Sequence, residues 1–174
     1  MKVLFYAKES QDVLAESDSL NKDYTYTLWK PMIISVVPLG VPKIPFIIWW
    51  AMHYLRLLGN RDYCLFIVYS GDTIVHRSCV FPRYFRFPFM DKDDLQIGDT
   101  WTAKEHRGKG LATFAIRKIF ELNKKSGRRF WYVTEEANIA SIRAVENAGF
   151  AQIGKGERLD RFGIKLIGSY LLET

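Results

Sequence analysis

The stretch Glu105-His106-Arg107-Gly108-Lys109-Gly110-Leu111-Ala112 joins a predicted strand to a predicted helix, residues 95–102 and 108–125. Gly108 and Gly110 are poor helix formers, yet they stand where the helix begins. Glycine lacks the Cβ that blocks close approach, and the free N–H groups and dipole of a helix N-terminus attract anions. The stretch therefore predicts an anion-binding turn, to which the neighbouring arginine and lysine add positive charge.

Two other nucleotide-binding patterns fit this turn poorly. No hydroxyl residue follows a Gly-Lys pair, as the pattern G-x-x-x-x-G-K-[ST] requires, and the third glycine of G-x-G-x-x-G is missing. A glycine-containing turn that binds nothing is the remaining structural alternative.

Outward from the turn, the chain predicts an α+β fold with a mixed, mostly antiparallel central sheet of about seven strands flanked by about four helices. Apolar residues at helical spacing, such as Leu111, Ala115 and Ile119, give helix 108–125 a face that would pack on this sheet. All 174 residues are expected to form one domain. The expected elements are strand 2–7, a weak helix 12–20, helix 44–58, strands 63–69, 73–81 and 95–102, helix 108–125, strand 128–133, helix 139–148, and strands 150–154 and 162–171.

The charge balance suits an acidic ligand. There are 25 Lys and Arg against 19 Asp and Glu, a formal net charge of +6, which would attract a phosphorylated cofactor, a nucleic acid or an anionic membrane. The basic residues are dispersed apart from one short cluster, so we expect no nucleic-acid partner. The cluster consists of Lys124, Lys125, Arg128 and Arg129.

The cysteines and the N-terminus indicate a reducing, cytoplasmic setting. Cys64 and Cys79 have no companions at metal-ligand spacing, so we expect buried thiols and no metal. The N-terminal segment becomes acidic at Glu9, before the apolar core of a signal peptide could develop.

Residues 44–58 form the most apolar segment, bounded by Pro45 and Gly59. The segment is shorter than the roughly 20 residues of a membrane-spanning helix. A helix that is apolar on all sides is usually buried, and we expect this; a helix at a membrane interface is the alternative.

Two motifs together resemble the GNAT superfamily of N-acetyltransferases. The stretch Arg107-Gly108-Lys109-Gly110-Leu111-Ala112 is similar to its acyl-CoA motif, Q/R-x-x-G-x-G/A, and Asn138, Ser141 and Gly149-Phe150 are spaced like its later motif. The resemblance covers about residues 95–155. It implies a GNAT-like fold and transfer of an acetyl group from acetyl-CoA to a primary amine.

The resemblance also implies which residues hold acetyl-CoA. Backbone N–H groups of 107–113 would bind the pyrophosphate, and the end of the 95–102 strand would pair with pantetheine where the strands holding Trp101 and Trp131 separate. Asn138 and Ser141 would contact the pantetheine arm, although a helix N-cap is an equally good role for Asn138. The implied set is Trp101, Thr102, Arg107, Gly108, Lys109, Gly110, Leu111, Ala112, Thr113, Asn138 and Ser141.

One departure from the family concerns the general acid. Many members have a Tyr four residues before the Gly-Phe pair, to protonate the leaving thiolate, and this chain has Val145. Tyr132, Tyr63 or a bound water could replace it, or the thiolate, whose conjugate thiol has a pKa of about 8.5, could be protonated by solvent.

The expected reaction is direct attack of a neutral amine on the thioester, with a backbone N–H near Thr102 stabilising the oxyanion. The candidate general bases are His76, which is preferred for its near-neutral pKa, Asp99 and Glu135. A structural histidine and a paired carboxylate are the alternatives. Asp99 is expected on the same strand face as Leu95, Ile97 and Trp101.

The aromatic stretch 81–90 and helix 44–58 are expected to form the acceptor side, and a small amine such as an amino sugar is the preferred acceptor. The alternatives are a protein or peptide N-acetyltransferase, and a non-catalytic acyl-CoA-binding or membrane-associated module. A membrane contact through 44–58 and a homodimer are further partners left open.

Overall fold

The computed structural model describes residues 1–12, 20–161 and 164–173, and its strands form one sheet in the order β2-β3-β4-β5-β6-β1-β7-β8. Every neighbouring pair is antiparallel except β5 and β6. The elements are β1 (Lys2–Glu9), β2 (Thr25–Trp29), α1 (Lys43–Tyr54), β3 (Cys64–Ser70), β4 (Thr73–Pro82), β5 (Leu95–Thr102), a short 3-10 turn (Lys104–His106), α2 (Leu111–Leu122), β6 (Arg129–Glu135), α3 (Ile139–Asn147), β7 (Ala151–Arg161) and β8 (Ile164–Glu173).

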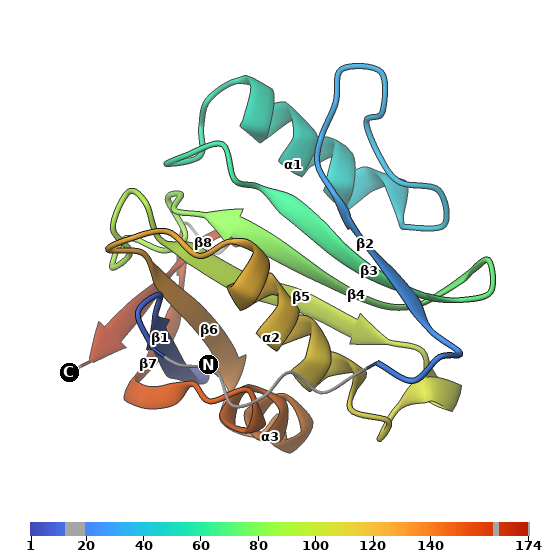
Figure 1. The fold of residues 1–174 in the computed structure, drawn as a ribbon. Helices are drawn as coiled ribbons and strands as arrows, with labels where there is room; N and C mark the ends of the chain where they lie inside the picture. Colours follow the sequence, from blue (N-terminus) through green and yellow to red (C-terminus); the bar gives the residue numbers. More distant parts are fainter. Residues whose placement is uncertain (13–19, 162–163, 174) are drawn as a thin grey trace.

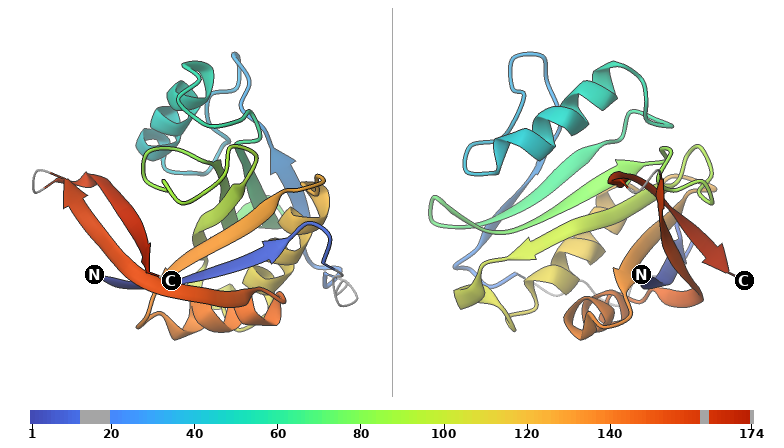
Figure 2. Two further views of the ribbon diagram at one scale, coloured as in Figure 1. Left: turned by 90° about the vertical axis from the view of Figure 1, so that its left-hand side faces the viewer. Right: turned by 180° about the vertical axis from the view of Figure 1, so that it is seen from behind.

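The two faces of the sheet carry different layers (Figure 1). Helices α2 and α3 cover one face, and α1 with the aromatic segment 83–94 covers the other (Figure 2). Strand β3 shows why both faces are buried: Cys64, Phe66 and Val68 enter the α2 core, while Leu65 and Ile67 enter the α1 core. A continuous apolar strand is what burial on both faces requires.

The parallel pair β5 and β6 is joined by α2, which crosses over between them, as a parallel connection requires. Their pairing is short, running only from Leu95 opposite Phe130 to Ile97 opposite Tyr132. Beyond these residues the two strands diverge (Figure 1). The sheet therefore opens at its centre, toward the turn that precedes α2.

The α+β class and the mostly antiparallel sheet are confirmed. The described residues form eight strands and three α-helices, where about seven and about four were expected. The additional strand is β2, whose five residues are too short to give a clear alternating pattern. The predicted helix 12–20 lies almost wholly outside the described residues.

The prediction that the apolar helix is buried was wrong. In α1 only Phe46 is buried, and Ile44, Ile47 and Ile48 are exposed. The segment is apolar on all sides, but the sheet covers only one of those sides. No helix among the residues that the structure describes has the length and apolarity to cross a membrane.

Candidate active site

The glycine-rich turn opens directly onto the start of α2. Gly108 and Gly110 have φ angles of 75° and 76°, and Gly110 is the N-cap residue, without a side-chain cap. A Cβ added at either glycine would meet nothing within 4 Å. Packing therefore does not require the glycines, whereas the left-handed backbone does. The first turn of α2 has no acidic residue, and its N–H groups lie at the positive end of the helix dipole.

The turn is fixed to the end of β5. Arg107 Nε donates a 3.2 Å hydrogen bond to the Thr102 carbonyl, and the Ala103 N–H donates to the Val75 carbonyl at 2.9 Å. Residues 98–102 of β5 have no pairing with β6. Their backbone groups that point toward β6 have no partner in that strand's ladder, although the Thr102 carbonyl already accepts from Arg107. The unpaired stretch between β5 and β6 is called the gap below. The glycine-rich turn and the gap together form the candidate site.

On the α1 face of the gap, Arg77, Asp99 and Trp101 form a cluster. Arg77 Nη1 lies 2.7 Å from Asp99 Oδ2, and the guanidinium lies over the Trp101 ring, 5.9 Å from its centroid. The same guanidinium also lies over the ring of Phe46, from α1, 5.2 Å from its centroid. Trp101 is 41% exposed, so its ring remains accessible beside a carboxylate. Arg77 and Phe46 were not among the predicted site residues, because no local sequence pattern identifies them.

The expected common face for Leu95, Ile97 and Asp99 was wrong. Leu95 and Ile97 belong to the α2 core, whereas Asp99 contacts Arg77 and Cys79 on the α1 face. The cause is a register shift between β4 and β5 together with a φ angle of 45° at Asp99. Such a bulge adds a residue to one strand and changes which face its side chains take.

On the α2 face, His76 is completely buried in a chain of hydroxyl groups. Its Nδ1 lies 2.8 Å from Thr102 Oγ1 and its Nε2 lies 3.0 Å from Ser78 Oγ, which in turn contacts Thr100 Oγ1 at 3.1 Å. Burial, reinforced by Arg77, lowers the pKa of His76 to about 4. The imidazole is therefore neutral at pH 7 and both of its nitrogens are occupied.

The remaining predicted residues lie on α2, at the end of β6 and at the start of α3. Asn138 is the N-cap of α3, and its Oδ1 accepts a 3.1 Å hydrogen bond from the Ser141 N–H. The Thr113 hydroxyl donates to the Ala144 carbonyl at 3.3 Å and so joins α2 to α3. Glu135 is exposed at the end of β6, on the opposite wall of the gap from Asp99. The cap is thus present at Asn138, and a ligand-binding role for it stays a prediction.

The tyrosines proposed to replace the general acid differ in their positions. Val145 is fully buried in the α2 core. Tyr132 is buried in that core as well, at the last β5–β6 pair before the strands diverge. Tyr63 lies on the α1 side; burial is the main reason that its pKa is raised far above the usual value. Tyr63 is consequently a poor proton donor, and Tyr132 is the better placed of the two.

Most side chains of the basic cluster after α2 form hydrogen bonds or ion pairs with other residues of the fold. Arg128 is buried and binds the backbone carbonyls of Asn123 and Asp93 as well as the carboxylate of Asp62. Beside it, Lys125 pairs with Asp93, and Arg129 pairs with Glu9. These charges have partners within the fold, and the absence of a nucleic-acid partner stays a prediction.

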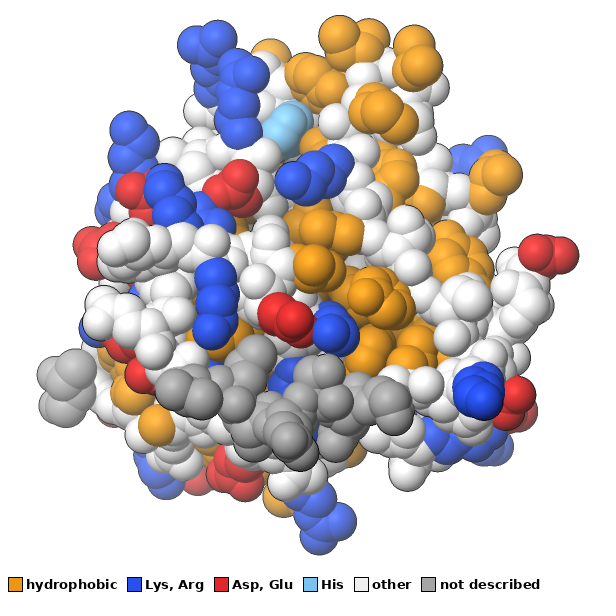
Figure 3. Space-filling model, in the orientation of Figure 1, with side chains coloured by type: hydrophobic (Ala, Val, Ile, Leu, Met, Phe, Trp, Pro, Cys, Tyr) orange, Lys and Arg blue, Asp and Glu red, His pale blue; other side chains and the backbone are white. Residues whose placement is uncertain are grey.

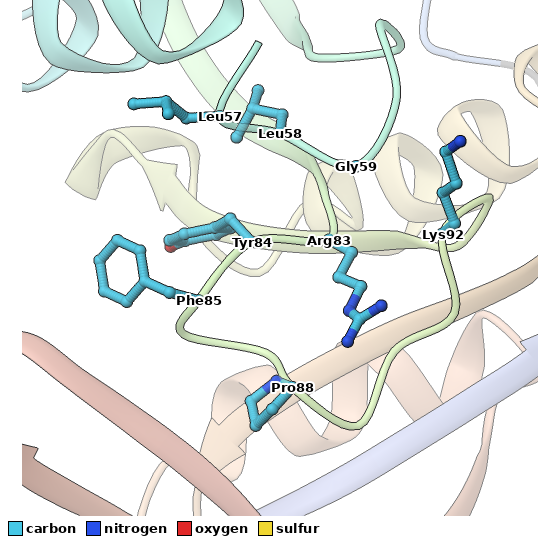
Figure 4. Close-up of a pocket in the computed structure, with 8 residues that line it drawn as sticks. All are labelled: Leu57, Leu58, Gly59, Arg83, Tyr84, Phe85, Pro88 and Lys92. Carbon is cyan, nitrogen blue, oxygen red and sulfur yellow. The ribbon is translucent and has the colours of Figure 1, made fainter.

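A groove of about 460 Å³ lies between the segment after α1 and the aromatic segment 83–94. Leu57 and Leu58 face Tyr84 and Phe85 across it, and Arg83 and Lys92 supply positive charge (Figure 4). Segment 83–94 joins the end of β4 to the start of β5, so the groove is at the opposite end of these strands from the gap. Several rings of the aromatic stretch are used in packing: Tyr84 and Phe87 are buried, and Phe87 stacks on Tyr170.

One family model and several solved structures resemble this chain. The model of the acetyltransferase (GNAT) family matches residues 26–150. A GNAT acetyltransferase from Colwellia psychrerythraea has a TM-score of 0.57 at 16% identity, covering 87% of this chain and 52% of its own. A putative GNAT acetyltransferase from Novosphingobium aromaticivorans has a TM-score of 0.54 at 16% identity, covering 88% and 60%. A tandem GNAT protein from the clavulanic acid biosynthesis pathway has a TM-score of 0.55 at 12% identity, covering 88% and 51%.

These likenesses concern the fold. The chain spans only 51% to 60% of the length of the three structures. A search of curated protein sequences finds no match.

Proposed function

The chain belongs to the GNAT acetyltransferase family, and from that premise we propose that it transfers an acetyl group from acetyl-CoA to the primary amine of a small molecule. The observation that carries this proposal is the continuity of the open glycine turn with the gap between β5 and β6. An anion can be held at the turn while an extended chain follows the unpaired edge of β5.

The residues of the turn fit a diphosphate. The two left-handed glycines leave the approach free of side chains, and Lys109 adds a flexible charge. We assign the pyrophosphate of acetyl-CoA to the N–H groups of 107–113 and the pantetheine to the backbone of Trp101 and Thr102. Bound there, the cosubstrate supplies the thioester, whose carbonyl an amine attacks. Asn138 and Ser141 stand at the far wall.

The amine acceptor is assigned to the α1 face of the gap. The exposed Trp101 ring offers a surface on which a sugar or another flat group stacks, and Asp99 attracts the ammonium form of the amine. Asp99 also becomes the preferred general base. His76 is buried on the other face with both nitrogens bonded, so we assign it to positioning Thr102. A backbone N–H near Thr102 is the group that we assign to stabilising the developing oxyanion. Glu135 is the alternative base on the opposite wall.

The demand on the base depends on the acceptor. An amine with a pKa near 8 is neutral in about one molecule in ten at pH 7, whereas a lysine-like amine is neutral in about one in two or three thousand. Unless a strong general base is positioned beside the amine, amines with a pKa of about 8 are the better substrates. For the leaving thiolate, Tyr132 or solvent is the assigned proton donor.

The test is turnover on a panel of amines. Purified protein is incubated with acetyl-CoA and with amino sugars, small polyamines, or peptides with a free N-terminus or lysine, and free thiol is followed over time. The proposal expects acceptor-dependent thiol release with at least one small amine. Release with peptides alone would replace it by a protein or peptide acetyltransferase, and CoA binding without release on any amine would leave a non-catalytic acyl-CoA-binding module.

A further inference from the structure

The outer side of α1 and the loop before it form an apolar area that nothing in the described chain covers. Among the nineteen large apolar residues that are exposed in the described part of the chain, ten lie within 32–57, and Ile34 and Leu39 are each 94% exposed. In Figure 3 these side chains gather at the top of the molecule, over α1 and the preceding loop. We call this area the α1 surface. It comprises Met32, Ile33, Ile34, Leu39, Ile44, Ile47, Ile48, Tyr54, Leu55 and Leu57.

The α1 surface is held together as one unit. Trp50 Nε1 donates a 3.0 Å hydrogen bond to the Met32 carbonyl, and the Tyr54 hydroxyl donates to the Pro31 carbonyl at 3.3 Å. The helix therefore carries the apolar loop with it. The Trp50 and Tyr54 rings pack together, with their centroids 4.9 Å apart. Trp and Tyr, with an apolar body and a polar edge, favour the boundary between water and lipid.

The charges around this surface have one sign. Between residues 24 and 61 there is no Asp or Glu, while Lys30, Lys43, Arg56 and Arg61 are all exposed. These 38 residues thus carry four of the six net positive charges of the chain. Basic side chains also border the orange area in Figure 3. The surface combines exposed isoleucine and leucine with unopposed positive charge.

We propose that the α1 surface docks the protein on an anionic phospholipid bilayer, with α1 lying in the plane of the interface. Apolar side chains enter the boundary of the acyl chains while the basic residues contact anionic headgroups. A second copy of the chain fits less well, because a two-fold contact brings the same patch of each copy together and opposes its positive charges. This membrane-docking proposal does not depend on the proposed acetyl transfer and adds a second property to the protein.

The test is co-sedimentation with vesicles. The full chain is mixed with vesicles of phosphatidylcholine alone or of phosphatidylcholine and phosphatidylglycerol in equal parts. The proposal expects binding to the anionic vesicles, weakened by high salt, and much less binding to the neutral ones. Ile34→Glu with Ile44→Glu should reduce the bound fraction by about tenfold or more, since both residues are highly exposed and the pair inserts charge into the apolar contact.

The matched control is Leu122→Glu with Ile153→Glu, two exposed apolar residues outside the α1 surface. This pair should bind vesicles like the unchanged protein, and both pairs should keep the CoA affinity and circular dichroism of the folded chain. Protein that stays in the supernatant with both kinds of vesicle overturns the proposal, as does equal loss in the two pairs. A dimer in light scattering that Ile34→Glu with Ile44→Glu dissociates, without vesicle binding, assigns the surface to a second copy instead.

Discussion

At the scale of single residues, His76 makes the stability of the fold depend on pH. Its pKa is lowered to about 4 in the folded chain, mainly by burial, against about 6.5 when unfolded. The neutral imidazole therefore stabilises the fold fully above pH 6.5, and this contribution is lost as the pH falls toward 4. Between pH 7.5 and 4.5 the loss is roughly 2 to 3 kcal/mol. Urea unfolding of His76→Gln at the two pH values should show a pH dependence smaller by about that amount; an unchanged difference would contradict the assignment.

Asp99 tests the assignment of the general base. Asn tolerates the positive φ angle of this position, so Asp99→Asn keeps the bulge while removing the charge. We expect kcat/KM to fall by roughly a factor of a hundred, with CoA affinity almost unchanged, because Asp99 lies on the acceptor face. Steady-state kinetics and calorimetry with CoA measure the two quantities. Wild-type turnover in Asp99→Asn, with a large loss in Glu135→Gln, would move the role to Glu135.

The sequence predicted site residues unevenly. Gly108 and Gly110 were identified because glycine is unfavourable at the start of a helix, so two glycines there indicate a functional turn. Arg77 was missed because its importance lies in contacts with Asp99, Trp101 and Phe46, which come from other elements. The side of the sheet taken by Asp99 was mispredicted, because a bulge depends on the pairing with β4.

At the scale of elements, Arg128 fixes how α2, β6 and the segment before β5 meet. Its guanidinium binds Asp62 and the carbonyls of Asn123 and Asp93 while being buried. Arg128→Ala leaves these groups without their partner and should cost about 3 kcal/mol of unfolding free energy. The adjacent Arg129→Ala removes only an exposed pair with Glu9 and should cost less than about 1 kcal/mol. Chemical denaturation of both variants compares them, and equal costs would refute this role for Arg128.

The order of the elements along the chain was easier to predict from the sequence than the contacts between them in space. The β3–β4 hairpin and α2 were predicted because turn residues and helical spacing are local signals. The early end of the β5–β6 pairing arises from strands distant in the chain, and no local pattern encodes it. For α1, hydropathy predicts that the helix is apolar, but it does not determine whether another element covers it.

At the scale of the whole molecule, the end of the β5–β6 pairing, the glycine-rich turn and the cluster on the α1 side of the sheet lie in one region. The turn lies where β5 leaves β6, and the cluster of Arg77, Asp99 and Trp101 lies on one side of the same opening. Membership in the GNAT family is the basis of the proposed acetyl transfer, and the proposal assigns acetyl-CoA to β5 with the amine beside it. The account depends most on the turn holding an anion.

The most direct measurement is CoA affinity of Gly110→Asp by calorimetry. The substitution places a carboxylate at the assigned pyrophosphate, and repulsion at about 4 Å in a partly dehydrated turn costs several kcal/mol. Gly71→Asp is the matched control, because Gly71 also has a positive φ angle and open space around it. The account predicts that Gly110→Asp weakens CoA binding by more than about tenfold while Gly71→Asp leaves it nearly unchanged. Full CoA affinity in a folded Gly110→Asp chain, or the same loss in both variants, would contradict it.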